Sequence, residues 1–427
     1  MTAVGPGGLR PDDGFTEPKS EDGRRTWAQR WHRVRLVPLI LLVVAALIAT
    51  ITGVVTARDA AKQVVPPGAV QETQTAQPVT VETSATPAST TSTADVCAPK
   101  PVDVVTGSPW TGEAREASEA VYSAELAKLE TPRVAVAGDD NWMFWGDIEA
   151  NNFSQSLGRS FLSADEADEW AGYFTELRGE LDERDIDLVI QVVPADWSVY
   201  PEMLPDWAEE LRGPTTLEYL ITSYPELPIM DMRQALRDAK SGGPVYAPGN
   251  SHWSPYGAAI GWEQLAACLG SVDEKYASLS PLEFSELEPV PADDSQPEPG
   301  LALSEAPVDW AQPVLQSPAS KMLLTSGDGT VVETTTAERL DMLELPAMTE
   351  TLDPQSEATA LIVRDSQGNS IGPAWQAGFA STKQIGHNLG SAGPPADIVA
   401  EADEFQPDVV VFEITERYLN WIPTLPE

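Results

Sequence analysis

Two short apolar runs most constrain what this chain can fold into. Residues 188–193 read Leu-Val-Ile-Gln-Val-Val, and residues 409–412 read Val-Val-Val-Phe. A strand with one wet face alternates apolar and polar residues, whereas runs without that alternation are typical of parallel strands buried on both faces. Other short β-rich segments extend the pattern, so that strands are expected at 133–137, 187–193, 229–232, 360–364, 384–388 and 408–414.

Helical patterns lie between these runs. The clearest spans 163–184, where Ser163 and Glu166 have the spacing of a capping box. Strands that alternate with helices predict an α/β fold with a doubly wound, mostly parallel sheet. Functional residues of such sheets lie at the carboxyl ends of the strands. The apolar residues of the helix recur at helical spacing, as is typical of a core-packed face: Trp170, Phe174, Leu177 and Leu181.

The N-terminal part of the chain has a different character. Residues 36–57 form an apolar run of 22 residues, which is long enough to span a bilayer as a helix. Arginines cluster before the run and are sparse after it, which predicts a cytoplasmic N-terminus and an extracytoplasmic bulk at the cell membrane. A cleaved signal peptide is the alternative, although the run is long for one. We therefore expect a disordered cytoplasmic tail at 1–35, a transmembrane helix at 36–57, a Thr/Ser/Pro-rich linker at 58–96 and an α/β domain at 97–427.

Charge and cysteine content exclude several classes of function. The net charge is −40, and nucleic acids and anionic lipid surfaces require the opposite sign in a partner. Cys97 and Cys268 are the only cysteines, and on the outer side of a membrane they favour one disulfide. Two unpaired buried thiols are the alternative. Because the chain has neither a metal-ligand spacing of Cys and His nor a phosphate-binding glycine loop, we expect no metal and no cofactor.

One acidic segment stands apart from the rest of the outer domain. Residues 276–358 are rich in Pro, Glu, Asp and Ser, with Lys321 and Arg339 as the only basic residues. We expect long loops or a small lid over the sheet. Long loops in compact domains are often functional, and a solvated excursion is the alternative.

A serine and a histidine are the candidate catalytic residues. Ser366 follows the apolar run 361–363 closely, at an expected turn, and His252 lies just ahead of a helix whose N-cap and first position are Ser254 and Pro255. A serine needs a nearby base to become a nucleophile, and the outer domain has only two histidines, of which His387 lies in a strand-like run. The pair predicts a serine-based acyl-transfer site. A turn serine and a structural helix-start histidine are the alternatives.

The residues after the serine suggest how an oxyanion could be held. Gln367 and Gly368 can place backbone N–H groups toward it, and Asn369 can donate its amide. Arg364 is a candidate for positioning or for binding an anionic substrate, with a surface ion pair to Asp365 as the alternative.

Five motifs in order resemble the alginate O-acetyltransferase AlgX/AlgJ-like family of the SGNH hydrolase superfamily, over roughly 130–427. The segments that carry the resemblance are 138–144, 193–202, 250–254, 364–366 and 413–419. The resemblance implies an SGNH-hydrolase-like fold and serine-dependent acetyl transfer to an extracytoplasmic envelope polysaccharide or glycolipid. A membrane-bound O-acyltransferase is then a candidate partner that supplies acetyl groups. Three residues within these motifs are candidate substrate-binding residues: Tyr200, Trp253 and Arg417.

Two residues depart from the family pattern. Asn250 stands where the family has its catalytic aspartate, and Asp196 stands where a lysine is usual. An asparagine can orient a histidine ring but carries no charge, and loss of that charge can slow a serine triad by about four orders of magnitude. Two function classes follow. The first is a membrane-anchored O-acetyltransferase or acetylesterase, and the second is a catalytically silent polysaccharide-binding or scaffold protein.

Overall fold

The computed structural model describes residues 112–291, 309–390 and 394–423. All of them belong to the second of the two units into which the chain divides, Pro87–Glu427. The predicted tail, transmembrane helix, linker and Cys97 lie outside the described residues. Within the described ranges, no helix is both long and apolar enough to cross a membrane.

A central sheet of eight strands organises the domain, in the order β10-β9-β11-β13-β12-β14-β3-β4. The strands from β13 to β4 are parallel neighbours, whereas β10, β9 and β11 pair antiparallel at the other edge. The predicted α/β fold is therefore present, with a mixed rather than a uniformly parallel sheet. The strands are β3 (Asp187–Val193), β4 (Ile229–Asp231), β9 (Lys321–Ser326), β10 (Val331–Thr335), β11 (Ala347–Thr351), β12 (Ser356–Arg364), β13 (Phe379–Gly386) and β14 (Val409–Thr415).

The parallel strands are buried on both faces, as their composition predicts. Side chains alternate between two core clusters along each strand: Val189 and Val411 pack on one face, and Ile190 and Phe412 pack on the other. All four are at most 3 % exposed. Burying an aliphatic or aromatic side chain of this size stabilises the fold by about 1.5–3 kcal/mol, so the apolar runs fix these strands at the centre of the sheet.

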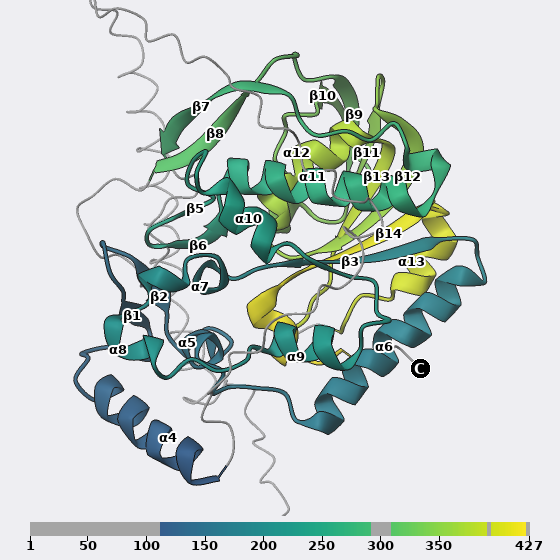
Figure 1. Ribbon diagram of the computed structural model, residues 1–427. Coiled ribbons are helices and arrows are strands. Elements are labelled where there is room, and N and C mark those ends of the chain that lie inside the picture. The colour runs from purple at the N-terminus through teal and green to yellow at the C-terminus, as the bar shows by residue number, and fades with distance from the viewer. Residues whose placement is uncertain (1–111, 292–308, 391–393, 424–427) are drawn as a thin grey trace, which may run out of the picture. The chain divides into compact units, whose positions relative to one another are not determined.

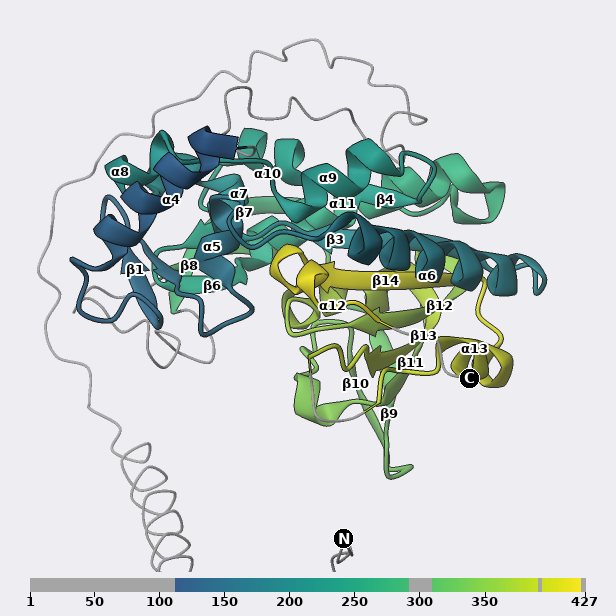
Figure 2. The ribbon, with the colours of Figure 1, turned by 90° about the horizontal axis from the view of Figure 1, so that it is seen from below.

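Helices cover both faces of this sheet (Figures 1 and 2). The helices α11 (Pro255–Val272) and α12 (Gly368–Gly378) pack on the face of the first cluster. On the opposite face lie α6 (Ala164–Asp182), α9 (Thr216–Ser223) and α13 (Ile398–Phe405). The predicted capping box is confirmed, because the Ser163 side chain accepts from the Glu166 N–H and the Glu166 carboxylate accepts from the Ser163 N–H.

Smaller elements complete the described part of the domain. The pair β5–β6 matters most here, because it carries His252 and forms a separate two-stranded antiparallel sheet. The other helices and strands are α4 (Gly112–Leu126), β1 (Ala135–Ala137), β2 (Met143–Trp145), α5 (Asn152–Ser156), α7 (Asp196–Val199), α8 (Asp206–Glu209), α10 (Arg233–Ala239), β5 (Tyr246–Ala247), β6 (Asn250–Trp253), β7 (Phe284–Pro291) and β8 (Asp309–Leu315).

The expectation of long loops at 276–358 is wrong for most of that segment. It contains the antiparallel pair β7–β8 and the strands β9, β10 and β11 that extend the main sheet. The strands β10 and β11 are short and Thr-rich, and β10 is mostly exposed. Their apolar signal is therefore weak beside the Pro, Asp and Glu of the intervening turns, and a reading of composition misses them.

Candidate active site

The fold brings Ser366 and His252 together from positions 114 residues apart in the chain. Ser366 lies in the turn between the end of β12 and the start of α12, and His252 lies on β6 immediately before α11. The Ser366 Oγ is 2.9 Å from the His252 Nε2, within the range expected for a nucleophile and its base. Both side chains are only partly buried, so a small substrate can reach the pair.

Asn250 sets the orientation and tautomer of the histidine. Its Oδ1 accepts the backbone N–H of His252 at 2.9 Å and lies 3.2 Å from the ring Nδ1. Because an amide oxygen only accepts, the ring carries its proton on Nδ1 and turns the lone pair of Nε2 toward Ser366. This is the tautomer that a general base needs. The asparagine thus orients the histidine as the carboxylate of a serine triad does, but it carries no negative charge to stabilise the imidazolium.

Asp365, the residue before the serine, is a buried anchor rather than one half of a surface ion pair. Its two carboxylate oxygens accept from the Gln367 N–H at 2.8 Å and from the Thr415 N–H and hydroxyl, both at 2.7 Å. Burial by itself would raise the pKa of this carboxyl, but a contact with His387 and these hydrogen bonds lower the pKa to about 2. The charged carboxylate therefore ties the nucleophile turn to the end of the neighbouring strand β14.

Arg364 is buried beneath the same turn and is 0 % exposed. Its guanidinium donates to the side-chain oxygens of Gln384 and Asn369, at 2.9 and 2.8 Å, and to the Leu340 carbonyl at 2.7 Å. Burial lowers its pKa to about 10, so it stays charged at neutral pH. Gly368 lies against it, since a Cβ there would be 2.2 Å from the Arg364 Cδ. The interpretation of Arg364 as a ligand for an anionic substrate is therefore wrong, and its contacts hold the turn.

The predicted oxyanion donors are also corrected. The N–H of Gln367 donates to the Asp365 carboxylate, and the N–H of Gly368 donates to the Asp365 carbonyl at 3.2 Å. The N–H of Ser366 itself has no hydrogen-bond partner among the described residues. The Asn369 amide makes one long hydrogen bond, at 3.4 Å, to Asp341. Ser366 N–H and Asn369 Nδ2 are therefore the donors that this turn can offer to an oxyanion.

The three candidate substrate-binding residues are buried. Trp253 is 0 % exposed, Arg417 is 3 % exposed and Tyr200 is 7 % exposed. The indole N–H of Trp253 donates to the Gln367 carbonyl, and the Tyr200 hydroxyl accepts from the Val245 N–H. Arg417 lies over the ring of Tyr418, 4.9 Å from its centroid. These side chains therefore pack inside the domain, and their contact with substrate stays a prediction.

Sequence reasoning missed a buried polar cluster beside the nucleophile. Glu413 accepts the Asp365 N–H at 2.9 Å, and His387 places Nε2 3.6 Å from the same aspartate. The His387 Nδ1 accepts from the Leu389 N–H, so Nε2 carries the proton that faces Asp365. Burial and the nearby Asp365 raise the pKa of Glu413 well above its ordinary value. Their positions in the sequence could have indicated the cluster, because these residues lie at the carboxyl ends of three adjacent parallel strands.

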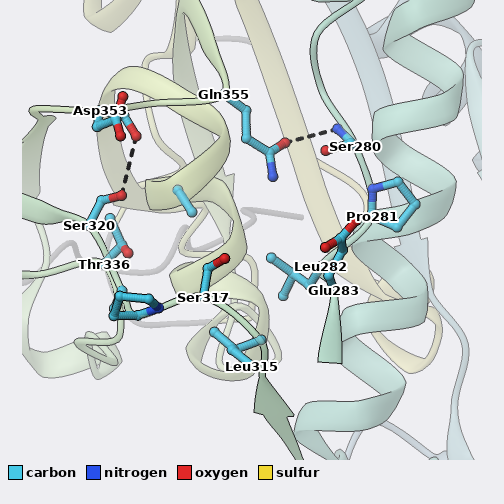
Figure 3. Close-up of a pocket in the computed structure, with 13 residues that line it drawn as sticks. Ser280, Pro281, Leu282, Glu283, Leu315, Ser317, Ser320, Thr336, Asp353 and Gln355 are labelled. Atoms are coloured by element: carbon cyan, nitrogen blue, oxygen red, sulfur yellow. Dashed lines mark hydrogen bonds between the residues drawn. The ribbon is translucent and has the colours of Figure 1, made fainter. Parts of the chain in front are cut away.

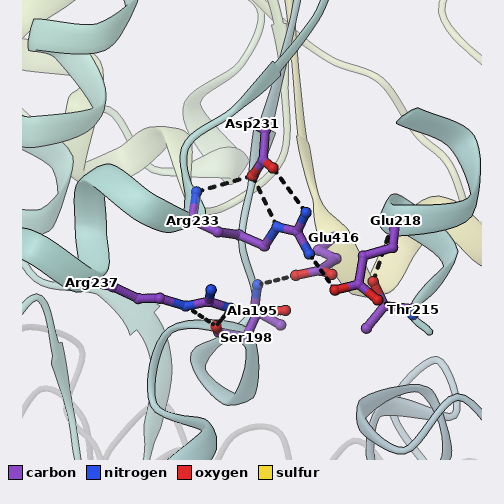
Figure 4. A network of polar contacts seen from close by, with 8 residues as sticks. All are labelled: Ala195, Ser198, Thr215, Glu218, Asp231, Arg233, Arg237 and Glu416. Carbon is purple, nitrogen blue, oxygen red and sulfur yellow. Dashed lines mark hydrogen bonds and ion pairs between the residues drawn. The ribbon is translucent and has the colours of Figure 1, made fainter. Parts of the chain in front are cut away.

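A second network lies farther along the same edge, at the ends of β3, β4 and β14 (Figure 4). Arg233 forms a paired contact with Asp231 and also donates to Glu218 at 2.9 Å. Glu416 is 0 % exposed and accepts the Ala195 N–H at 3.0 Å. A buried ion pair that loses one partner typically costs about 3–5 kcal/mol, so this network holds the strand ends in place.

Two hollows run along one face of α12. The first, of about 450 Å³, is lined by residues near the starts of α11 and α12, the helices that follow His252 and Ser366 in the chain, including Pro255 and Ser370. The second, of about 420 Å³, shares Leu282 and Leu315 with the first and lies at the far end of α12 (Figure 3). The α12 residues that line them recur at helical spacing: Ser370, Pro373, Ala374 and Ala377. Concave sites of this size are typical of small-molecule binding.

Comparison with known proteins finds a family model that matches part of the chain. Residues 135–335 match the family model described as SGNH hydrolase-like domain, acetyltransferase AlgX. That range includes His252 and ends before Ser366. No curated protein sequence matches the chain.

Solved structures show similarity at low sequence identity. Bacillus cereus PatB1 with a sulfonyl adduct is 14 % identical, with 68 % of this chain and 99 % of that chain covered and a TM-score of 0.49. The O-acetyltransferase domain of Pseudomonas putida AlgJ is 17 % identical, with 68 % and 94 % covered and a TM-score of 0.38. Pseudomonas aeruginosa AlgX is 17 % identical, with 66 % and 61 % covered and a TM-score of 0.35. Residues 135–335 are thus similar to the SGNH hydrolase-like domain of acetyltransferase AlgX.

Proposed function

We propose that this protein transfers acetyl groups to hydroxyls of a cell-envelope polysaccharide or glycolipid, through an acetyl-serine at Ser366. The observation that supports this most is the hydrogen-bonded series Ser366 Oγ, His252 Nε2 and Nδ1, and Asn250 Oδ1, with separations of 2.9 and 3.2 Å. A neutral histidine oriented in this way can take the serine proton. The match to the AlgX acetyltransferase model supports acetyl as the group transferred.

The proposed reaction has two halves. In the first, His252 Nε2 takes the Ser366 hydroxyl proton as Oγ attacks the acetyl carbonyl carbon, and the imidazolium then protonates the leaving group of the donor. In the second, an acceptor hydroxyl gives its proton to His252 and attacks the acetyl-serine, and the imidazolium returns a proton to Ser366 Oγ. Both halves pass through an oxyanion, for which the Ser366 N–H and the Asn369 amide are the donors within the turn. Water in place of the acceptor gives hydrolysis.

We place the acceptor in the hollow that begins at Pro255 and Ser370. It adjoins the first turns of α11 and α12, and these helices follow His252 and Ser366 directly in the chain. A small acetyl ester needs only the catalytic pair, whereas a saccharide is large enough to extend along α12. Filling the hollow should therefore affect the acceptor and the donor differently.

Ser370→Tyr is expected to raise the KM for an oligosaccharide acceptor about tenfold, a cost of roughly 1.4 kcal/mol. It should leave p-nitrophenyl acetate hydrolysis within about twofold of wild type, because the small ester does not need the hollow. The measurement compares transfer to neutral glucose-, mannose- and N-acetylglucosamine-based oligomers with hydrolysis of the donor alone. Ser223→Tyr is the matched control, since Ser223 is an exposed helical serine outside the hollow. Equal losses in transfer and hydrolysis would contradict this placement of the acceptor.

We also propose that residues 36–57 anchor the protein in the cell membrane, with the catalytic domain on the outer side. The support is the length of the apolar run and the arginines before it. A membrane-bound O-acyltransferase is the proposed source of acetyl groups. The Cys97–Cys268 disulfide stays a prediction that fits this compartment. Cys268 is buried on α11, and Cys97 lies outside the described residues.

A further inference from the structure

Gln367, the residue next to the nucleophile, holds both peptide groups that flank His252. Its side-chain Nε2 donates to the Ser251 carbonyl at 2.9 Å, and its Oε1 accepts from the Trp253 N–H at 3.0 Å. The amide thus pairs with β6 on both sides of the catalytic histidine. Gln367 is 0 % exposed, so no water competes for these hydrogen bonds.

A third hydrogen bond joins the same two segments in the opposite direction. The indole N–H of Trp253 donates to the backbone carbonyl of Gln367 at 2.9 Å. The indole is itself fixed, because a Cβ added to Gly261 of α11 would lie 2.6 Å from its ring. The nucleophile turn and the strand of the base are therefore joined by three buried hydrogen bonds that involve neither catalytic side chain.

The position of His252 depends on such contacts because β6 is not part of the main sheet. Among the described strands it pairs only with β5, through a short and irregular register. Ser366, by contrast, is held by β12 and α12. A displacement of about 1 Å between reacting groups can cost about 100-fold in rate. Contacts that join β6 directly to the nucleophile turn are therefore needed to fix the distance between the two side chains.

We propose that Gln367 is a positioning residue, whose side-chain amide sets the separation of Ser366 and His252 by pairing with the Ser251 and Trp253 peptide groups. The inference rests on the proposed Ser366–His252 chemistry and goes beyond it. It predicts that the amide acts on turnover through geometry, while substrate binding is unaffected.

Two variants of the full-length protein separate this role from simple stabilisation. Gln367→Met keeps the length of the side chain and removes both hydrogen bonds, and it should lower kcat for p-nitrophenyl acetate about 10- to 100-fold with little change in KM. Gln367→Glu loses the donor to Ser251 when ionised and regains it when protonated. The ratio of its kcat to that of wild type should therefore rise as pH falls, whereas the ratio for Gln367→Met should stay flat.

Gln376→Met is the matched control, since Gln376 is also fully buried on α12 and lies outside the contacts to β6. It should lower the Tm without lowering kcat. The inference is overturned if Gln367→Met keeps wild-type kcat, or if the Gln367→Glu ratio does not change with pH. The pH series is measured within the single variant Gln367→Glu. It therefore tests the positioning role even if Gln367→Met fails to fold. A loss of activity in Ser366→Ala beside a fully active Gln367→Met would refute the positioning role alone. Full activity in Ser366→Ala would overturn the proposed function as well.

Discussion

Replacing Ser366 with alanine is expected to reduce p-nitrophenyl acetate hydrolysis at least about 10⁴-fold, because the covalent route disappears with the nucleophile. His252→Ala should cause a loss of similar size. The Ser366→Ala/His252→Ala double variant should lose no more than either single variant, because two groups that act as a unit give non-additive effects. The measurement is the initial rate of the full-length protein with each variant.

Thermal unfolding of the variants distinguishes chemistry from folding. Ser366 is partly exposed, and among the described residues its hydroxyl hydrogen-bonds only to the histidine, so Ser366→Ala should keep the wild-type Tm. Ser223→Ala, an exposed serine on α9, should keep both rate and Tm. Equal rates in wild type and Ser366→Ala would favour the silent binding protein over the acetyltransferase.

Asn250→Asp is expected to increase turnover by about tenfold or more. A carboxylate at this position would stabilise the imidazolium that forms when His252 takes the serine proton. The gain should stay well below the roughly 10⁴-fold effect seen when a triad aspartate is replaced, because much of that effect comes from the wrong tautomer. Here Asn250 already gives the correct tautomer, since the backbone N–H of His252 fixes the direction of its amide.

The opposite change at the same position provides the control. Asn250→Ala removes the acceptor for the ring N–H and should lower turnover below wild type. The aspartate also brings a desolvation cost, because Asn250 is 2 % exposed. This desolvation cost should lower the Tm of Asn250→Asp. It should not reverse the expected increase in turnover. A lower turnover in Asn250→Asp than in wild type would contradict the assigned role of this side chain.

The strands of the parallel part of the sheet could be predicted because burial on both faces leaves a strong composition signal. The predicted segment 187–193 coincides with β3, and 408–414 differs from β14 by one residue at each end. The antiparallel strands β9–β11 could not be found in this way. Each is short and partly exposed, and β11 joins them to the main sheet by pairing with β13, more than 30 residues away in sequence. Tertiary context therefore overrides the weak local pattern.

The candidate site could be predicted at its two catalytic side chains and not in its supporting contacts. Ser366 and His252 stand out because a serine follows a strand and a histidine precedes a helix. The contacts of Gln367 with Ser251 and Trp253 join segments 116 and 114 residues apart, and no local pattern encodes them. The same holds for the turn, where the Asp365 carboxylate and carbonyl take the two N–H groups that sequence reasoning assigned to the oxyanion.

The most direct test of the central claim is to trap the acetyl-enzyme. Full-length protein is mixed with p-nitrophenyl acetate, quenched in acid within the first turnover and digested, and the peptides are analysed by mass spectrometry. The account predicts one added acetyl group on the peptide that contains Ser366 in wild type, no such group in Ser366→Ala, and its loss when an oligosaccharide acceptor is added before the quench. Acetylation that persists in Ser366→Ala at the wild-type level, or that lies only on another residue, would contradict it.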